Sequence, residues 1–230
     1  MPLSGTVKIA EAGVLGLDFN ADGQTMTPQL AEALRDAGYR FCLRYVPREA
    51  EAKTVAFDLR KQEAQFLLDS GFALMVVQHF ERDPEWVPFA DKGRRYGAFA
   101  AQWAREKIEL PEGVCVFLDL EAVKSGTPKQ DIIDYCLAWH GEVKAAGYAP
   151  GIYVGNRARL TGKEIAEKLP FEHHWEAFNE QFEIPTGIQL KQIFVTATSP
   201  LRPAGAKGFR FQADRTSIDN KGRALRWLAP

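Results

Sequence analysis

The sequence at 114–121 reads Val114-Cys115-Val116-Phe117-Leu118-Asp119-Leu120-Glu121, an apolar run that ends in two acids. An unbroken apolar run of this kind is typical of a strand buried on both faces, as in a parallel sheet. Two carboxylates are tolerated only at the end of such a strand. Because residues i and i+2 of a strand point the same way, Asp119 and Glu121 should project from one face, with Cα atoms roughly 6.6 Å apart.

Two carboxyls this close repel each other, which favours one of them keeping its proton near neutral pH. A protonated acid beside an ionised partner is the arrangement that cleavage of a glycosidic bond requires. The same pair, Asp119 and Glu121, could instead cap the next helix or bind a loop backbone, because a motif this short is weak.

The composition favours one large core and argues against some classes of partner and site. With 230 residues, of which 46% are hydrophobic, the chain can form a single domain over residues 1–230. The formal net charge of -1 and the lack of a dense Lys/Arg run argue against nucleic acid as a partner. Three cysteines lie far apart in apolar segments, and the four histidines form no ligand spacing with them: Cys42, Cys115, Cys136, His79, His140, His173 and His174. We therefore expect buried reduced thiols and no metal site.

Strand-like apolar runs alternate with helix-like segments along the whole chain, as in an α/β protein with a parallel sheet. We predict eight strands, near residues 14–19, 41–46, 72–80, 114–120, 151–154, 174–178, 188–195 and 209–213. Capping signals at Thr27, Thr127 and Thr161 predict helix starts, whereas 178–188 and 196–208 have the composition of loops. The pattern predicts a (β/α)8 TIM-like barrel that is degenerate, with some helices missing in the C-terminal half; an open doubly wound sheet is the alternative.

Polar and acidic residues gather where these strands end. In a barrel, the C-terminal ends of the strands form the functional face. We therefore predict that acids from strands one, four and eight converge at one mouth: Asp18, Asp119 and Glu121, with Asp214 and Asp219 after the last strand. Aromatic and hydrogen-bonding groups that would suit the faces and hydroxyls of a sugar are expected from Arg44, Tyr45, His79, Phe80, Tyr153 and Gln212. Each also has a structural alternative: Tyr153 or Phe80 as core, His79 as a satisfied buried histidine, and Arg44 as a counter-ion to Asp18 or Glu121.

These motifs resemble those of a known enzyme family. The segments Gly16-Leu17-Asp18, Gln78-His79-Phe80, Asp119-Leu120-Glu121, Gly151-Ile152-Tyr153, Phe211-Gln212 and Ile218-Asp219-Asn220 are similar to those of the family 25 glycoside hydrolases, the lysozymes of bacteria and phages. With Arg44-Tyr45 on the second strand, the chain more closely resembles the bacterial glycoside-hydrolase-like domain of unknown function, a distant relative of those lysozymes. The resemblance implies a barrel with an incomplete helix set. It also implies that Glu121 is the general acid and Asp119 its partner, with Asp18 and Asp219 completing the cluster.

The leading hypothesis is hydrolysis of a β-linked, N-acetylated glycan such as bacterial cell-wall peptidoglycan, by a monomer that needs no metal or organic cofactor. Asp119 could orient the acetamido group of the substrate, attack the sugar or activate water. A catalytically silent glycan-binding barrel is the alternative, and an unrelated barrel enzyme acting on a phosphorylated metabolite is a third. Residues 1–13 contain no export signal and no apolar run approaches 18 residues, so we expect no membrane insertion. Access to the wall would then depend on lysis, a holin or a secretion machine.

Overall fold

Eight strands form a closed barrel in the computed structural model, which describes residues 3–81 and 86–230. Residues 1–2, at the start of the segment that was expected to lack an export signal, lie outside the described residues. The strands follow one another around the barrel in sequence order: β2 (Leu15–Phe19), β3 (Tyr39–Val46), β4 (Ala73–Gln78), β5 (Cys115–Leu120), β6 (Ala149–Val154), β7 (His173–Glu176), β8 (Leu190–Ile193) and β9 (Gln212–Thr216). Pairing of β9 with β2 completes the ring. The predicted α/β barrel is confirmed, and the open sheet is excluded.

The last barrel strand runs in the opposite direction to the other seven. Strands β2 to β8 pair in parallel, whereas β9 is antiparallel to both β8 and β2. The β8–β9 connection contains only the short 3-10 helix η3 (Ala204–Ala206). Because no helical crossover carries the chain back to the other end of the barrel, β9 begins at the end where β8 stops. The chain after β9 therefore emerges at the amino-terminal end of the parallel strands.

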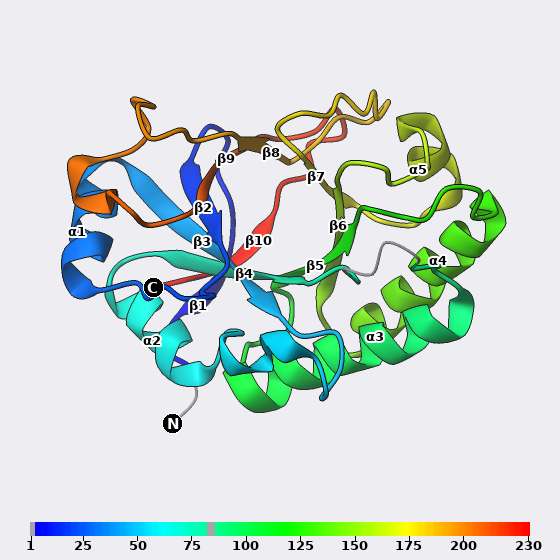
Figure 1. The fold of residues 1–230 in the computed structure, drawn as a ribbon, viewed down its shortest axis with the longest axis horizontal. Helices are drawn as coiled ribbons and strands as arrows, with labels where there is room; N and C mark the ends of the chain where they lie inside the picture. Colours follow the sequence, from blue (N-terminus) through cyan, green and yellow to red (C-terminus); the bar gives the residue numbers. More distant parts are fainter. Residues whose placement is uncertain (1–2, 82–85) are drawn as a thin grey trace.

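Helices cover one side of the barrel more fully than the other (Figure 1). They are α1 (Pro28–Asp36), α2 (Lys61–Asp69), α3 (Ala90–Trp103), α4 (Lys129–Ala145) and α5 (Gly162–Lys168); η1 (Lys53–Ala56) is a 3-10 helix and η2 (Ala104–Ile108) a π-helical extension of α3. Thr27 and Thr161 cap α1 and α5 as predicted. The capping box at Thr127 is wrong, because its hydroxyl donates to the Lys124 carbonyl and Pro128 occupies the N-cap of α4. Within the described residues, no helix is both long and apolar enough to cross a membrane.

Two short strands outside the barrel lie at its amino-terminal end. β1 (Thr6–Ile9) pairs antiparallel with β10 (Arg226–Ala229), and Leu228 of β10 lies opposite Leu74 of β4. Trp227 is buried and its ring packs 5.5 Å from that of Phe41. The chain therefore closes this end of the barrel with its own terminal segments.

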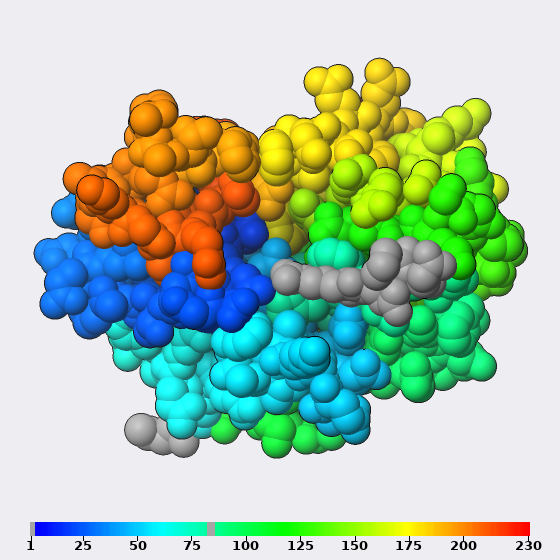
Figure 2. Space-filling model, in the orientation of Figure 1, coloured from blue at the N-terminus to red at the C-terminus, as the bar shows by residue number. Residues whose placement is uncertain are grey.

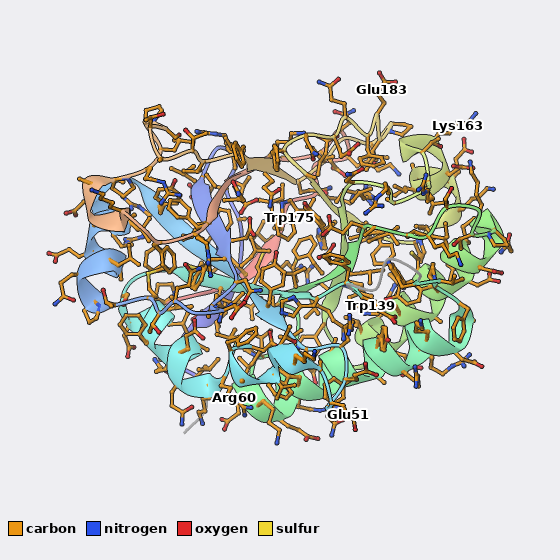
Figure 3. The ribbon with its side chains drawn as sticks, in the orientation of Figure 1. Glu51, Arg60, Trp139, Lys163, Trp175 and Glu183 are labelled. Atoms are coloured by element: carbon orange, nitrogen blue, oxygen red, sulfur yellow. The ribbon has the colours of Figure 1, made fainter. Side chains whose placement is uncertain are left out.

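Large aromatic rings fill the interior beneath the carboxyl ends of the strands. A Cβ at Gly16 would lie 2.3 Å from the Phe41 ring, and one at Gly151 would lie 2.4 Å from the Phe117 ring. Only glycine leaves room for these rings, so the two glycines are part of how the core is packed. Trp175 lies inside the barrel, whereas the side chain of Trp139, a residue of α4, packs between that helix and the sheet (Figure 3). The result is a packed interior on which a polar layer rests at the carboxyl end.

Candidate active site

Four carboxyl groups meet near the carboxyl ends of the parallel strands. We call them the acidic cluster: Asp18 on β2, Asp119 on β5, Glu121 immediately after β5, and Asp214 on β9. Two neighbouring tyrosines, Tyr45 and Tyr153, are affected by the charges of these acids. Burial raises the pKa of Tyr45 and Tyr153 well above the ordinary value, and the charges of Asp18, Asp119 and Glu121 raise both further. The structure therefore brings Asp214 together with three of the other expected acids and leaves out Asp219.

Glu121 is held at its position by a strained turn. Its carbonyl accepts a hydrogen bond from the Trp86 indole at 3.2 Å. The next residue, Ala122, has φ +55°, a left-handed conformation that costs roughly 1–2 kcal/mol for a residue with a Cβ. The Ala122 amide donates to the Asn156 carbonyl at 2.8 Å and so fixes this turn. Strain that the surroundings impose at one residue is a feature of functional sites.

Glu121 is also the most accessible acid of the cluster. Asp18, Asp119 and Asp214 are 5%, 3% and 0% exposed, whereas Glu121 is half-buried. On the neighbouring strand end, Gly155 leaves room for it, because a Cβ at Gly155 would lie 2.4 Å from Glu121 Oε2. A group that hands a proton to a substrate must reach it, and Glu121 meets that condition best.

Asp18 and Asp214 form a buried, interacting pair of carboxyls. Burial raises the pKa of Asp18 to about 6, although Gln192, Asp214 and Tyr45 stabilise its charged form. Burial and the charge of Asp18 raise the pKa of Asp214 well above its usual range, and the neighbouring Trp175 indole opposes the rise. The pair therefore holds protons more tightly than two separate carboxyls in water would.

This pair predicts a pH-dependent effect of Asp18→Asn on stability. The folded-state pKa of about 6 lies above the ordinary value of 3.8, so the folded state binds the proton more tightly than the unfolded chain does. The stability from this group is complete below pH 4 and is lost as pH rises through about 6. We expect Asp18→Asn to raise the free energy of unfolding relative to wild type by roughly 1–3 kcal/mol at pH 8 and by little near pH 4. Urea denaturation at both pH values measures this.

The same change at an exposed aspartate provides the control. Asp22→Asn alters a solvent-exposed side chain next to the same strand, so its effect should be equal at the two pH values. A gain for Asp18→Asn that is as large at pH 4 as at pH 8 would contradict the raised pKa of Asp18.

Hydrogen bonds connect the acidic cluster to its neighbours across the barrel. Tyr45 Oη donates to Asp18 Oδ1 at 3.4 Å, and Gln192 Nε2 donates to Asp18 Oδ2 at 2.9 Å. Tyr153 Oη donates to Gln192 Oε1 at 3.3 Å. The rings of Tyr153 and Trp175 meet edge to face with centroids 4.5 Å apart. One connected layer thus spans β2, β3, β6, β7 and β8.

His79 belongs to this layer through the ring of Tyr45. The two rings stack with centroids 4.5 Å apart, and His79 Nε2 lies 2.7 Å from Asp58 Oδ1. His79 is 5% exposed. His79 therefore packs against the Tyr45 ring. This position fits the alternative of a satisfied buried histidine better than a residue that contacts a ligand.

Two sequence expectations are wrong. Asp219 lies at the opposite end of the barrel from Glu121, because β9 is antiparallel and delivers the chain there; its carboxylate accepts from Gln189 and pairs with Arg223 at 2.6 Å. Arg44 is fully buried on the outer face of β3. Its guanidinium pairs with Glu63 at 2.7 Å and covers the Phe19 ring, so it neither lines the site nor neutralises an acid of the cluster.

Phe80 and Gln212, the other two residues predicted to bind substrate, lie near this layer of hydrogen-bonded side chains. Phe80 is half-buried just beyond β4, and its carbonyl accepts from Arg48. Gln212 lies opposite Asp18 in the β2–β9 pairing, and its Oε1 accepts from the Val195 amide. Neither contacts an acid of the cluster through a hydrogen bond between the described residues.

Sequence reasoning placed Asp214 after the last strand but chose Asp219 for the cluster, and it did not single out Gln192 or Trp175. A signal was present for Asp214, because Gln212 and Asp214 are separated by two positions on a strand and so point the same way. Gln192 and Trp175 lie on short strands whose inward faces cannot be identified until the neighbouring strands are known.

The chemistry available to the acidic cluster is proton transfer between carboxyls in different environments. Three members are shielded from water, and one is accessible. Within residues 3–81 and 86–230, no group of three or more His, Cys, Asp or Glu side chains is arranged to hold a metal ion. The pattern of one accessible acid above ionisable partners is that of acid-base catalysis by carboxyl groups.

Solved structures share this fold across nearly the whole chain. The Tat-secreted protein Rv2525c of Mycobacterium tuberculosis, in complex with L-tartrate, has a TM-score of 0.62 at 15% identity over 90% of this chain and 96% of that chain. The same protein in complex with HEPES gives 0.60 at 16% identity, over 89% and 95% of the two chains. An uncharacterized protein of B. stearothermophilus gives 0.62 at 19% identity, over 89% and 96%.

The sequence itself matches a family over residues 32–197, a region that contains Asp119 and Glu121. A search of curated proteins found no match. The matched region covers more than half of the chain. The chain therefore belongs to the family described as Rv2525c-like, glycoside hydrolase-like domain.

Proposed function

We propose that this barrel hydrolyses β-linked, N-acetylated glycans, with bacterial cell-wall peptidoglycan as the substrate. One observation carries the proposal: Glu121, the accessible acid, is fixed by a strained turn beside Asp119 and above the buried Asp18–Asp214 pair. A carboxylic acid next to ionised partners is what protonation of a glycosidic oxygen requires. Membership in a glycoside hydrolase-like family supports the same reaction class.

In the proposed reaction, the Glu121 carboxyl donates its proton to the glycosidic oxygen while the bond from that oxygen to the anomeric carbon breaks. Asp119 acts on the other side of the reaction: it orients the substrate's acetamido group as nucleophile, attacks the anomeric carbon itself, or takes a proton from the attacking water. Water supplies the new hydroxyl at the anomeric carbon. Its other proton returns to Glu121 in the two retaining routes; in the inverting route it goes to Asp119, and exchange with solvent then restores both carboxyls. The anomeric configuration of the first product separates inversion from the two retaining routes.

A catalytically silent glycan-binding barrel is the second candidate. It is favoured by the burial of Asp18, Asp119 and Asp214, since acids that are 5% exposed or less have little access to a substrate in this conformation. A buried acidic cluster could then act only to shape a binding face. The complexes of Rv2525c with L-tartrate and HEPES support small polar ligands for the family, which agrees with either candidate.

A paired assay separates the two candidates. Wild-type protein is incubated with dye-labelled peptidoglycan to measure release of soluble fragments, and binding of chitohexaose is measured by calorimetry on the same preparation. Both binding and release are expected. Binding without release would identify the silent module, and absence of both would remove glycans as the ligand class.

Two exposed aromatic side chains lie at the end of the barrel that carries the acidic cluster. We expect them to contact a bound glycan. Phe178 follows β7, Phe194 follows β8, and they are 42% and 51% exposed; their rings stack 4.8 Å apart. The loops that carry them, yellow and orange in Figure 2, lie next to each other along one edge. Aromatic faces pack well against the apolar faces of sugar rings. We expect Phe178→Ala with Phe194→Ala to weaken chitohexaose binding roughly three- to tenfold.

The control for that variant is Leu137→Ala on α4, which removes another apolar side chain, 40% exposed, away from the β7 and β8 loops. Chitohexaose affinity should be unchanged by Leu137→Ala. Equal affinities for wild type and the double variant in calorimetry would show that the aromatic pair does not contact the glycan.

A further inference from the structure

A cavity of about 360 Å³ lies at the amino-terminal end of β6 and β7, the opposite end of these strands from the acidic cluster. Its volume falls within the range of small-molecule sites, roughly 300–1,000 Å³. Its lining comes from the end of α4, the first residues of β6 and β7, and the segment 222–226 that leads into β10. Nothing in the proposed glycan chemistry uses this cavity.

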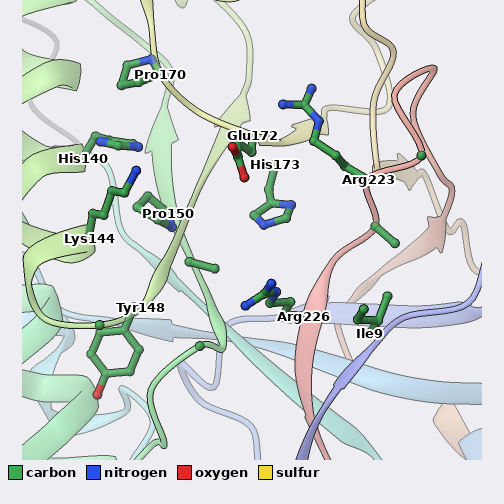
Figure 4. A pocket seen from close by; sticks show the side chains of 15 residues that line it. Ile9, His140, Lys144, Tyr148, Pro150, Pro170, Glu172, His173, Arg223 and Arg226 are labelled. Atoms are coloured by element: carbon green, nitrogen blue, oxygen red, sulfur yellow. The ribbon is translucent and has the colours of Figure 1, made fainter.

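The lining of this cavity carries an excess of positive charge. Lys144, Arg223 and Arg226 contribute three cations, and Glu172 contributes one carboxylate. Arg223 already pairs with Asp219 at 2.6 Å, whereas Lys144 and Arg226 form no salt bridge with any described residue. Figure 4 shows Lys144 on one side of the cavity and Arg226 on the other. Two cations thus face one space from different elements without a protein counter-ion of their own.

A buried histidine adds an unused hydrogen-bonding group to the same wall. His173 is 6% exposed, and its Nδ1 is buried without a hydrogen-bond partner. Burial, together with the charges of Arg223 and Arg226, lowers the pKa of His173 to about 4, although the charge of Glu172 opposes the shift. The ring is therefore neutral at pH 7 and can donate one N–H. An unsatisfied buried polar atom is costly, and a ligand can satisfy it.

The rest of the lining limits the shape of a ligand. Pro150 and Pro170 present apolar surfaces to the cavity. An inorganic ion alone would leave these surfaces uncovered. A short carbon skeleton that carries a charged group would cover them and still place its charge near the two cations.

We propose that this cavity binds a small organic anion, with Lys144 and Arg226 contacting its carboxylate or phosphate oxygens and His173 lying on its buried side. The site is independent of the proposed glycan hydrolysis, so either proposal can fail without the other. Carboxylates and phosphate esters share the anionic oxygens that both cations recognise, and the choice of probe distinguishes them.

Calorimetry with three probes tests the proposal on the full chain. Glycerol 3-phosphate and succinate represent the two anion classes, and glycerol is the uncharged parent of the first. Saturable binding is expected for at least one anion and not for glycerol. The variant with both Lys144→Gln and Arg226→Gln should bind that anion at least roughly tenfold more weakly, since it loses two charge-assisted contacts.

Lys53→Gln is the matched control, because Lys53 is an exposed lysine in η1, which follows the carboxyl end of β3. It removes one positive charge far from the cavity and should leave anion affinity unchanged. Equal binding of glycerol and the anions, absence of binding by both anions, or unchanged affinity in the double variant would overturn the proposal. Ring resonances of His173 in wild-type protein give a second measurement that needs no variant: they should shift with saturation by the anion, and resonances that do not shift would also overturn it.

Discussion

Replacement of Glu121 by glutamine is expected to lower the rate of glycan hydrolysis by roughly 10²- to 10⁴-fold, the usual loss when a general acid is removed. Glutamine keeps the size of the side chain and its place beside Gly155 but has no proton to give. Glycan affinity should change little, because the fold and the surrounding layer are kept. The rate of dye release from labelled peptidoglycan under saturating conditions measures the effect.

Glu183→Gln provides the matched control for this variant. Glu183 is an exposed glutamate whose side chain points away from the barrel (Figure 3). It should release dye at the wild-type rate. Wild-type turnover by Glu121→Gln would remove Glu121 from the mechanism.

Gly155→Ala is expected to reduce hydrolysis by roughly ten- to a hundredfold without removing any reacting group, because a displacement of about 1 Å is enough to cost that much. The added Cβ would lie 2.4 Å from Glu121 Oε2, 2.8 Å from Glu121 Cβ and 2.9 Å from the Tyr153 ring. The carboxylate can turn away, but Glu121 Cβ and the buried Tyr153 ring have little freedom. The Glu121 carboxyl must therefore shift, and kcat should fall more than glycan affinity.

Gly141→Ala on α4 is the control, since a Cβ there meets nothing within 4 Å. It should keep full activity and gain slightly in stability, because alanine favours a helix over glycine. If Gly155→Ala kept wild-type kcat with an intact fold, the position of the Glu121 carboxyl would not control the reaction.

The barrel could be predicted from sequence because each of its strands is a distinct apolar or alternating run. The run that contains Phe117 and Leu118 gives β5 almost to the residue. β1 and β10 were missed because each has only four residues. Those of β1 are mostly exposed, and those of β10 are adjacent to the chain terminus. The direction of β9 has no local sequence signal, since a strand has the same alternation whichever way it runs.

In the candidate site too, residues with a local sequence signal could be predicted, whereas those that depend on strand direction could not. Asp119, Glu121 and Asp18 could be placed because they end strands that run parallel. Asp219 was misplaced by the direction of β9 alone. Arg44 was misplaced, whereas its neighbour Tyr45 does face the acidic cluster. Adjacent residues on a strand face opposite sides, so only one of the two could enter the barrel.

Hydrolysis in water enriched in ¹⁸O shows whether the barrel cleaves glycosidic bonds. Chitohexaose or purified peptidoglycan is incubated with wild-type protein, and the products are examined by mass spectrometry for new reducing ends. The proposed mechanism predicts one ¹⁸O atom at each new reducing end, formed by wild type and by Glu183→Gln but not by Glu121→Gln. Glycan that is bound by the wild-type protein yet recovered intact, with no labelled ends, would contradict hydrolysis and establish the barrel as a binding module.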